Sequence, residues 1–325
     1  MRQGDAAGDI VELTGLPISS PIGFMAALGL LRVCAQDHGL DVRLSWSQSH
    51  ARLHGVAAGT LAQLLAEHMR GRSKAPEFNF EVIGEKGKSG PVMHLREIAP
   101  ADFRAAVAAF RGNERALGFL AGFATDAVVN KKRFVANTGL DLSGASQKLA
   151  DSFRALAAML DPTKSRPKVP LTTRINRALF GGPYEEQHTF GWDPASLMTH
   201  AHLSAAPTDM GDSKTPGQPM AVWLAVEGLP LHPVVPVGPR RARTAGFAGT
   251  QAYVWPQWTE PLTLPEVALL RQRPVESLDQ LPGVTALWIS AVISVSGNRR
   301  FLRPAARTRS VATASKRFAL AEVTE

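Results

Sequence analysis

The amino-acid sequence predicts a mixed α/β protein of the α+β class, with a helix-rich middle, short mixed strands and an extended carboxyl-terminal third. Three observations support this fold class. Residues 10–46 have the pattern of a strand, an apolar helix and a second strand. Residues 101–124 are rich in alanine and have a helical pattern, and residues 145–160 space their apolar side chains as a helix does. Residues 286–297, "ALWISAVISVSG", are typical of a strand.

The length of 325 residues is slightly above the usual limit for one hydrophobic core, which favours two closely apposed lobes. We predict an N-terminal α/β lobe with a helical middle over residues 1-165 and a C-terminal α+β basic lobe over residues 166-325. The boundary falls in "DPTKSRPKVP", residues 161–170, whose three prolines and three cations are typical of a linker. A second polar break covers residues 204–219.

The first helix is predicted within "SSPIGFMAALGLLRV", residues 19–33. Ser19 or Ser20 can cap it, Pro21 suits the first helical position and Gly39 can end it. One face then carries the apolar side chains of Phe24, Ala27, Leu28, Leu31 and Ala35. The other side is slim enough for close packing, with Gly23, Ala26 and Gly29. An anion could bind at this helix N-terminus, but a core helix is the favoured interpretation.

A targeting segment is the other possible interpretation of this apolar run. The preceding residues 1–16 contain only Arg2 as a cation, against three carboxylates, so no basic region of a signal peptide is present. Arg32 and Asp37 interrupt the run before it reaches the roughly twenty residues of a membrane span. We therefore expect a cytoplasmic protein. Its single cysteine, Cys34, fits a reducing compartment and is expected to be buried and inert.

The remaining elements follow from periodicity and from glycine and proline positions. Strands are predicted at residues 10–14, 42–46, 51–53, 77–83 and 286–297, with short proline-limited extended pieces in "HPVVPVG" and "AYVWPQW". Helices are predicted at residues 60–70, in two parts of 101–124 divided at 111–113, at 145–160 and at 222–229.

No enzyme motif stands out. "GEKGKSG", residues 84–90, resembles a P-loop but has two residues, not four, between its first glycine and Gly87-Lys88-Ser89. No nucleophile elbow is present. Glu227 is the best isolated carboxylate, and a structural role at a helix end is the favoured interpretation for it. We therefore expect a protein that is not an enzyme, with no catalytic residue and no cofactor.

One alternative remains open, a cytosolic metal-dependent hydrolase acting on a phosphorylated or nucleotide substrate. It depends on His200 and His202, whose spacing on a strand would point both rings to one side, with Asp193, Asp209 and Asp212 near in sequence. No second ligand motif supports this pair, so we expect no metal site.

Basic residues are clustered in a way that a solvated surface does not explain. The net charge is +8, and residues 296–320 contain no acidic side chain. Arginine predominates in the last two clusters, and its planar fork suits phosphates and guanine edges. We therefore predict nucleic-acid contact by these clusters. Their members are Lys131, Lys132, Arg133, Lys164, Arg166, Lys168, Arg240, Arg241, Arg243, Arg299, Arg300, Arg303, Arg307 and Arg309.

A family resemblance points the same way. The opening strand, "SPIGFMAALGLLRV" and the strand "RLSW" resemble the start of proteins from type I-U (also called I-G) CRISPR loci. "FGWDP", "LAVEGLPLHPVVPVG" and "RTAGF" follow in the expected order. The chain is similar to the short large-subunit candidates of the interference (Cascade) complexes in those systems. Residues 55–185 do not contribute to the resemblance.

The resemblance implies a non-catalytic subunit of a CRISPR RNA-guided surveillance complex in antiviral defence. Its implied partners are CRISPR RNA, double-stranded target DNA with its flanking motif (PAM), the other Cascade subunits and a helicase-nuclease, with no membrane contact. The family has no defined motif for these contacts. The basic residues named above therefore follow from charge and from glycine context alone.

Overall fold

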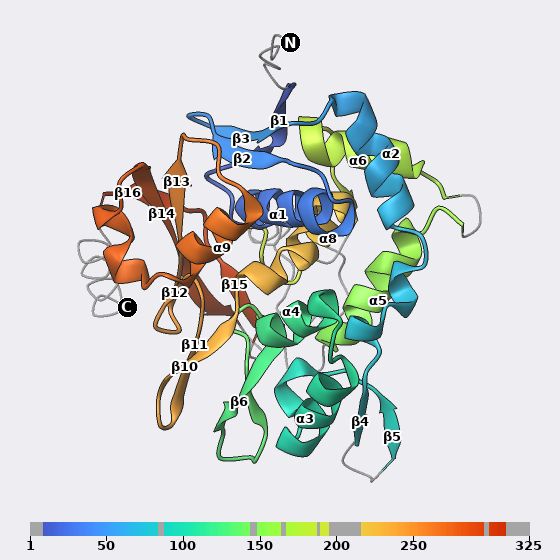
Figure 1. The fold of residues 1–325 in the computed structure, drawn as a ribbon, viewed down its shortest axis with the longest axis vertical. Helices are drawn as coiled ribbons and strands as arrows, with labels where there is room; N and C mark the ends of the chain where they lie inside the picture. The colour runs from blue at the N-terminus through green and yellow to red at the C-terminus, as the bar shows by residue number, and fades with distance from the viewer. Residues whose placement is uncertain are drawn as a thin grey trace, which may run out of the picture.

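The computed structural model describes residues 9–83, 88–143, 148–163, 167–186, 189–194, 216–295 and 299–309. It has the mixed α+β fold that the sequence predicts. Two buried helices, α1 and α8, lie in the middle of the molecule, with a small sheet on one side and a larger sheet on another (Figure 1). Further helices cover the remaining sides.

The N-terminal segment forms the predicted strand, helix and strand. It contains β1 (Ile10–Pro17), α1 (Pro21–Arg32), one π-helical turn (Val33–Asp37), β2 (Arg43–Trp46) and β3 (His50–His54). The three strands form an antiparallel sheet in the order β1–β3–β2. The side chain of Ser20 accepts a hydrogen bond from the Gly23 N–H, and Pro21 occupies the first turn, as predicted.

Helix α1 is buried along its whole length because it packs closely against α8 (Pro219–Glu227). A Cβ atom added to Gly29 would overlap the carbonyl oxygen of Leu224, so only glycine permits this approach. The apolar face of α1 also packs the Phe24 ring against Trp46 and Trp255, with ring centroids 5.6 and 5.8 Å apart. The apolar run is therefore a core helix, and Cys34 beside it is buried.

The middle of the chain is helical, as expected. It contains α2 (Ala58–His68), α3 (Pro100–Ala109), α4 (Glu114–Phe123), α5 (Leu149–Leu160) and α6 (Leu171–Phe180). The hairpins β4 (Glu81–Ile83) with β5 (Ser89–Pro91), and β6 (Ala124–Val129) with β7 (Val135–Asn137), project from it. The prediction of one strand over residues 77–83 is partly wrong. Pro76–Phe78 is a 3-10 turn because Phe78 turns into a cluster with Phe119, Phe153 and Trp223.

The C-terminal third is more extended. It contains β8 (Glu185–Glu186) paired with β9 (Pro216–Gly217), the hairpin β10 (Val234–Gly238) with β11 (Arg241–Thr244), and a larger sheet. That sheet is formed by β12 (Phe247–Ala248), β13 (Ala252–Trp258), β14 (Val284–Val295), β15 (Arg299–Leu302) and β16 (Ala306–Thr308). Helix α9 (Leu264–Gln272) and a 3-10 segment, Val275–Gln280, separate β13 from β14.

One hydrophobic cluster includes described residues from both predicted lobes, from Val11 to Leu302. The predicted boundary at residues 165 and 166 involves residues outside the described part, so the division into lobes stays a prediction. Among the residues that the structure describes, no helix is both long and apolar enough to cross a membrane.

Candidate functional site

The first basic cluster forms the turn of the β6–β7 hairpin. Asn130 organises this turn, because its side-chain oxygen accepts hydrogen bonds from the backbone N–H groups of Lys132 and Phe134 at 2.9 and 3.1 Å. Arg133 has a positive φ of 66°, which reverses the chain. The side chains of Lys131, Lys132 and Arg133 are all exposed at the tip of the hairpin.

The second basic cluster forms the turn of the β10–β11 hairpin. Arg240 and Arg241 are exposed, beside a register shift between Pro236 and Gly238. Arg243 differs from them, since its guanidinium lies 3.6 Å from the carboxylate of Glu276 and faces the 3-10 segment before β14. Two of the three predicted arginines are thus directed to solvent.

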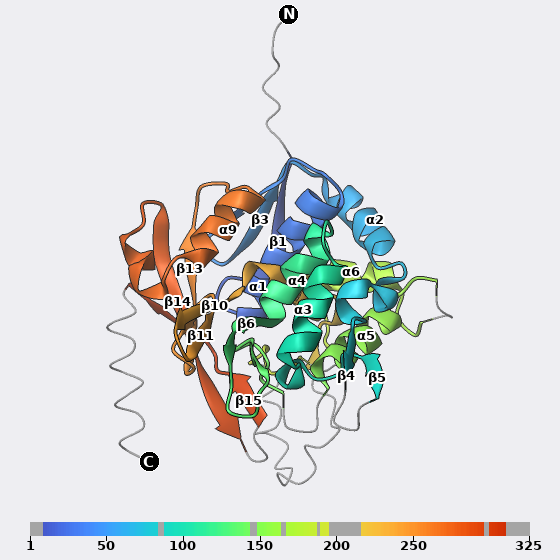
Figure 2. The ribbon, with the colours of Figure 1, turned by 60° about the horizontal axis from the view of Figure 1, so that its bottom comes forward.

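The two hairpins are neighbours. Both β10 and β11 contact β6, and the hairpins project from the same end of the molecule (Figures 1 and 2). The segment that follows β7 ties them together, because the Gly139 N–H donates to Thr244 Oγ1 of β11 at 2.6 Å. The predicted clusters at residues 131–133 and 240–241 therefore lie on adjacent elements, although they are more than one hundred residues apart in sequence.

The third cluster is divided by the structure. Arg300 of β15 donates to the Asp141 carbonyl oxygen at 2.7 Å, and its backbone N–H donates to Leu142 at 3.0 Å. These bonds bring β15 to the same segment that joins the hairpins. The Arg300 side chain therefore holds β15 against the segment that contains Asp141. Burial lowers the pKa of Arg300 from its ordinary value. Arg299 begins the same strand, and Arg303, just after it, is exposed.

The remaining predicted cations lie elsewhere. Arg307 of β16 and Arg309 are exposed, but β16 pairs with Leu287–Ile289 of β14, whereas β15 pairs with Val292–Val295. They therefore lie toward the other end of that strand. Lys168 is exposed in the segment before α6, and α6 lies away from the two hairpins (Figures 1 and 2). Lys164 and Arg166 lie outside the described residues.

A second group of charged side chains is buried in the core, around Glu227 at the end of α8. Glu227 has no exposed surface, and its carboxylate accepts hydrogen bonds from His68 Nε2 at 2.8 Å and from Arg115 Nη2 at 2.7 and 2.8 Å. Arg32 of α1 also forms an ion pair with it. Helices α1, α2, α4 and α8 are therefore joined at this one carboxylate.

The network extends outward from Arg115. Its guanidinium contacts Glu77 at 2.7 Å and forms an ion pair with Asp37, while Arg72 pairs with Glu77. Three arginines thus meet three carboxylates. Arg32 and Arg115 also share one aromatic neighbour, since each guanidinium lies 5.2 Å from the centroid of the Phe119 ring.

The protonation states of Glu227 and His68 determine the net charge of this buried network. Burial raises the pKa of the Glu227 carboxyl, but the charges of Arg115 and Arg32 and the hydrogen bond from His68 hold that pKa well below its usual range. Burial lowers the pKa of His68 despite the neighbouring carboxylate. Near pH 7 a neutral His68 therefore donates to an ionised Glu227, and the three arginines and three carboxylates cancel.

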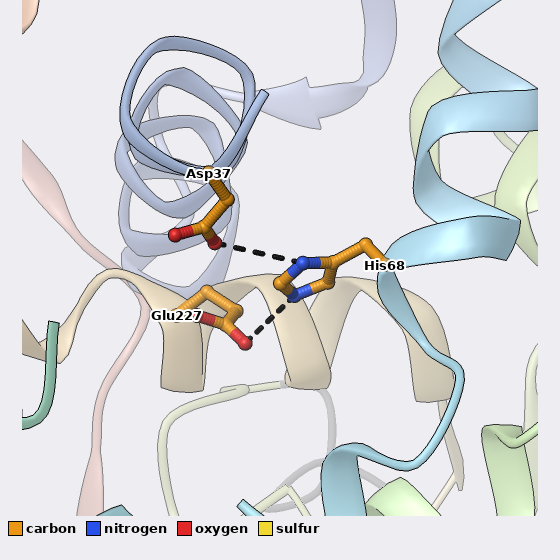
Figure 3. A group of neighbouring side chains, drawn as sticks. All are labelled: Asp37, His68 and Glu227. Atoms are coloured by element: carbon orange, nitrogen blue, oxygen red, sulfur yellow. Dashed lines mark hydrogen bonds and ion pairs between the residues drawn. The ribbon is translucent and has the colours of Figure 1, made fainter. Parts of the chain in front are cut away.

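Asp37, His68 and Glu227 also form a group with metal-ligand chemistry (Figure 3). Their ligand atoms lie within 4.8 Å of one another, and His68 lies between the two carboxylates. Both carboxylates are already neutralised by guanidinium groups, and a divalent cation here would lie among three arginines. The donor set therefore fits an ion-pair network better than a metal centre.

The alternative metal pair cannot be placed, since His200, His202, Asp209 and Asp212 lie outside the described residues. Asp193 is described and buried. Glu227, which sequence analysis singled out, is the last residue of α8, at the helix end where it was expected. Its partners could not be found from the sequence, because they are 112 to 195 residues away in the chain.

Comparison with known proteins does not assign the chain to a family. No protein-family model matches this chain, and no curated protein is significantly similar to it.

Proposed function

We propose that the protein is a non-catalytic nucleic-acid-binding subunit of a CRISPR RNA-guided surveillance complex of the Cascade type. The observation that carries the proposal is the pair of neighbouring hairpins whose turns expose Lys131, Lys132, Arg133, Arg240 and Arg241. Within the described part of the chain, none of these five side chains has an ion-pair partner. They are free to neutralise phosphates, which releases counterions and favours binding.

The shape of this surface suits a duplex. A two-stranded ribbon fits into the major groove of B-DNA, and here two ribbons project together. Val235 and Val237 of β10 are exposed below the second turn, at 37% and 48% of their surface, and would supply apolar contact beside the cations. We infer that double-stranded target DNA next to its flanking motif is bound here, with CRISPR RNA and the other subunits nearby.

The proposal extends to the setting of the protein. It includes a cytoplasmic location, assembly with other Cascade subunits and presentation of the bound DNA to a helicase-nuclease. Its support is the family resemblance in both halves of the chain, together with the clustered cations. The sequence motifs behind the resemblance form α1, α8 and the β10–β11 hairpin, which pack in the core or carry the basic turn.

Binding measurements on two variants test the proposal. We expect Arg240→Ala/Arg241→Ala to weaken binding of a fluorescein-labelled duplex in anisotropy titrations. Each lost phosphate contact should flatten the log–log salt dependence by about 0.9, so the double variant should flatten it by about 1.8. The variant Lys131→Ala/Lys132→Ala should behave alike, since its cations lie on the neighbouring turn.

A charge-matched control separates a local site from general attraction. Arg43 on β2 and Arg70 after α2 are exposed and belong to elements far from the hairpins (Figure 1). Removing both lowers the net charge from +8 to +6, as the Arg240/Arg241 double variant does. Equal loss of affinity in both double variants would mean that no local site exists, and the proposal would be abandoned.

A further inference from the structure

A serine, a histidine and a carboxylate form a hydrogen-bonded chain on the N-terminal sheet, on the opposite side of the molecule from the basic hairpins (Figures 1 and 2). Ser49 Oγ lies 2.9 Å from His50 Nδ1, and His50 Nε2 lies 2.6 Å from Glu12 Oε2. Ser49 is in the turn between β2 and β3, His50 begins β3, and Glu12 is on the neighbouring strand β1. Both ring nitrogens of His50 are thus engaged.

Glu12 determines which nitrogen of the His50 ring carries the proton in the neutral form. Glu12 also accepts from Arg52 Nε at 2.8 Å, and these two strands pair Glu12 with Arg52 directly. Burial raises the pKa of Glu12, but the hydrogen bonds from His50 and Arg52 outweigh it and lower that pKa. An ionised carboxylate at Nε2 requires a proton on that nitrogen. In the neutral ring, Nδ1 then presents its lone pair to the Ser49 hydroxyl.

The turn that carries the serine is held by Ser47. Its hydroxyl oxygen accepts from the backbone N–H groups of Ser49 and His50 at 3.2 and 2.9 Å, and its proton is donated to the His50 carbonyl oxygen. The Ser49 carbonyl oxygen accepts from the Ile18 N–H at 2.9 Å. Ser49 itself is exposed. The hydroxyl is therefore both fixed in place and accessible to a small molecule.

We propose that Ser49 is an activated nucleophile, with His50 as its general base and Glu12 as the group that orients the ring, and that it is a site of covalent modification by activated acyl or phosphonyl electrophiles. No oxyanion-binding pair forms part of the proposal. The reaction is therefore stoichiometric modification, which goes beyond the proposed nucleic-acid function and does not depend on it.

With an alkyl phosphonofluoridate, the modification is a substitution at phosphorus. Ser49 Oγ forms the new O–P bond while the P–F bond breaks, and fluoride leaves with the bonding electron pair. The hydroxyl proton moves to His50 Nδ1, and Glu12 stabilises the imidazolium that forms. The imidazolium then loses that proton to solvent.

The chain contains a matched serine–histidine pair that lacks the activating features. Ser45 Oγ lies 2.8 Å from His54 Nε2, a distance similar to that of the Ser49 pair. Ser45 is buried, and among the described residues no carboxylate is hydrogen-bonded to the His54 ring. Burial lowers the pKa of His54, with the charges of Arg52 and Arg43 adding to the effect. Ser45 should therefore stay unmodified, which makes it the internal control.

The test is exposure of the full chain to an alkyl phosphonofluoridate, followed by intact-mass measurement and peptide mapping. We expect a single adduct on Ser49, absent from Ser49→Ala and retained in Ser45→Ala. His50→Gln should slow labelling by about 100-fold or more, the usual contribution of a general base. Far-UV circular dichroism and the melting temperature of each variant should match wild type, because all three side chains lie near the surface.

A second variant separates activation from simple placement. Glu12→Gln keeps the size and shape of the side chain beside His50 Nε2 but removes its charge, so labelling of Ser49 should be slower than in wild type, because the imidazolium that forms loses its carboxylate partner. Labelling spread over several serines, or a Ser49 rate unchanged in His50→Gln and Glu12→Gln, would show that Ser49 is an ordinary hydroxyl and overturn the proposal.

Discussion

Replacing Glu227 by glutamine should destabilise the protein strongly, because this carboxylate balances the buried arginines. The substitution keeps the side-chain shape and removes one negative charge. The three arginines would then face only Asp37 and Glu77, which leaves one uncompensated positive charge in the core. Breaking a buried ion pair in this way typically costs about 3–5 kcal/mol. For a chain of 325 residues that corresponds to a melting temperature lower by about 4–7 °C.

The measurement is urea unfolding followed by tryptophan fluorescence, since Trp223 lies on α8 with Glu227. The control is Glu276→Gln, which removes the same charge from a pair with Arg243 that is 61% exposed at the carboxylate and 3.6 Å long. Such a pair contributes at most about 1 kcal/mol. If Glu227→Gln cost no more than Glu276→Gln, the buried network would not hold the four helices together.

Three further predictions follow from the core. Burial lowers the pKa of His68 and of His232, so the unfolded chain takes up protons that the folded chain does not. The free energy of unfolding should therefore fall as the pH drops below about 6.5. The check is urea unfolding, whose midpoint should be lower at pH 5 than at pH 7.5. Gly29→Ala should prevent soluble expression, because a Cβ there overlaps a carbonyl oxygen of α8, whereas Gly59→Ala on α2 meets open space and should be neutral or stabilising by less than about 1 kcal/mol in thermal melts. Cys34 should react with a thiol reagent only after unfolding, since burial raises its pKa to about 12; rapid labelling of the native protein would contradict its place in the core.

Local patterns predicted those elements whose boundaries are written in the sequence. Helix α1 was predictable because Ser20, Pro21 and an apolar run act within one segment. Helix α6 is absent from the sequence prediction, although Leu171, Ile175 and Leu179 have helical spacing, because polar residues and the prolines before it resemble a linker.

Strand β13 illustrates a limit of proline-based prediction. Pro256 suggests a short, proline-limited extended piece, yet it lies inside a seven-residue buried strand. The strand tolerates it because β12 pairs only with Ala252 and Tyr253, so β13 has a single neighbour, β14, at Pro256. The pairing partner, which the sequence does not reveal, decides the outcome.

The candidate sites, like the fold, could be predicted only in part from the sequence. The basic turns could be predicted because each is a local cluster of cations between glycine, proline or asparagine residues. Their proximity could not, since it depends on the contact between Gly139 and Thr244. Arg243 and Arg300 belong to predicted clusters, but they have partners inside the protein that no local pattern shows.

The central claim, that the two hairpin turns contact nucleic acid, is tested most directly by site-specific cross-linking. A photoreactive benzoylphenylalanine would replace Lys132, Arg240 or, as a control on the opposite sheet, Arg43. Each protein would be irradiated with a labelled duplex at 150 mM salt. Cross-links from positions 132 and 240, and none from position 43, are the predicted result. Equal cross-linking from all three positions, or from position 43 alone, would contradict the proposed interface.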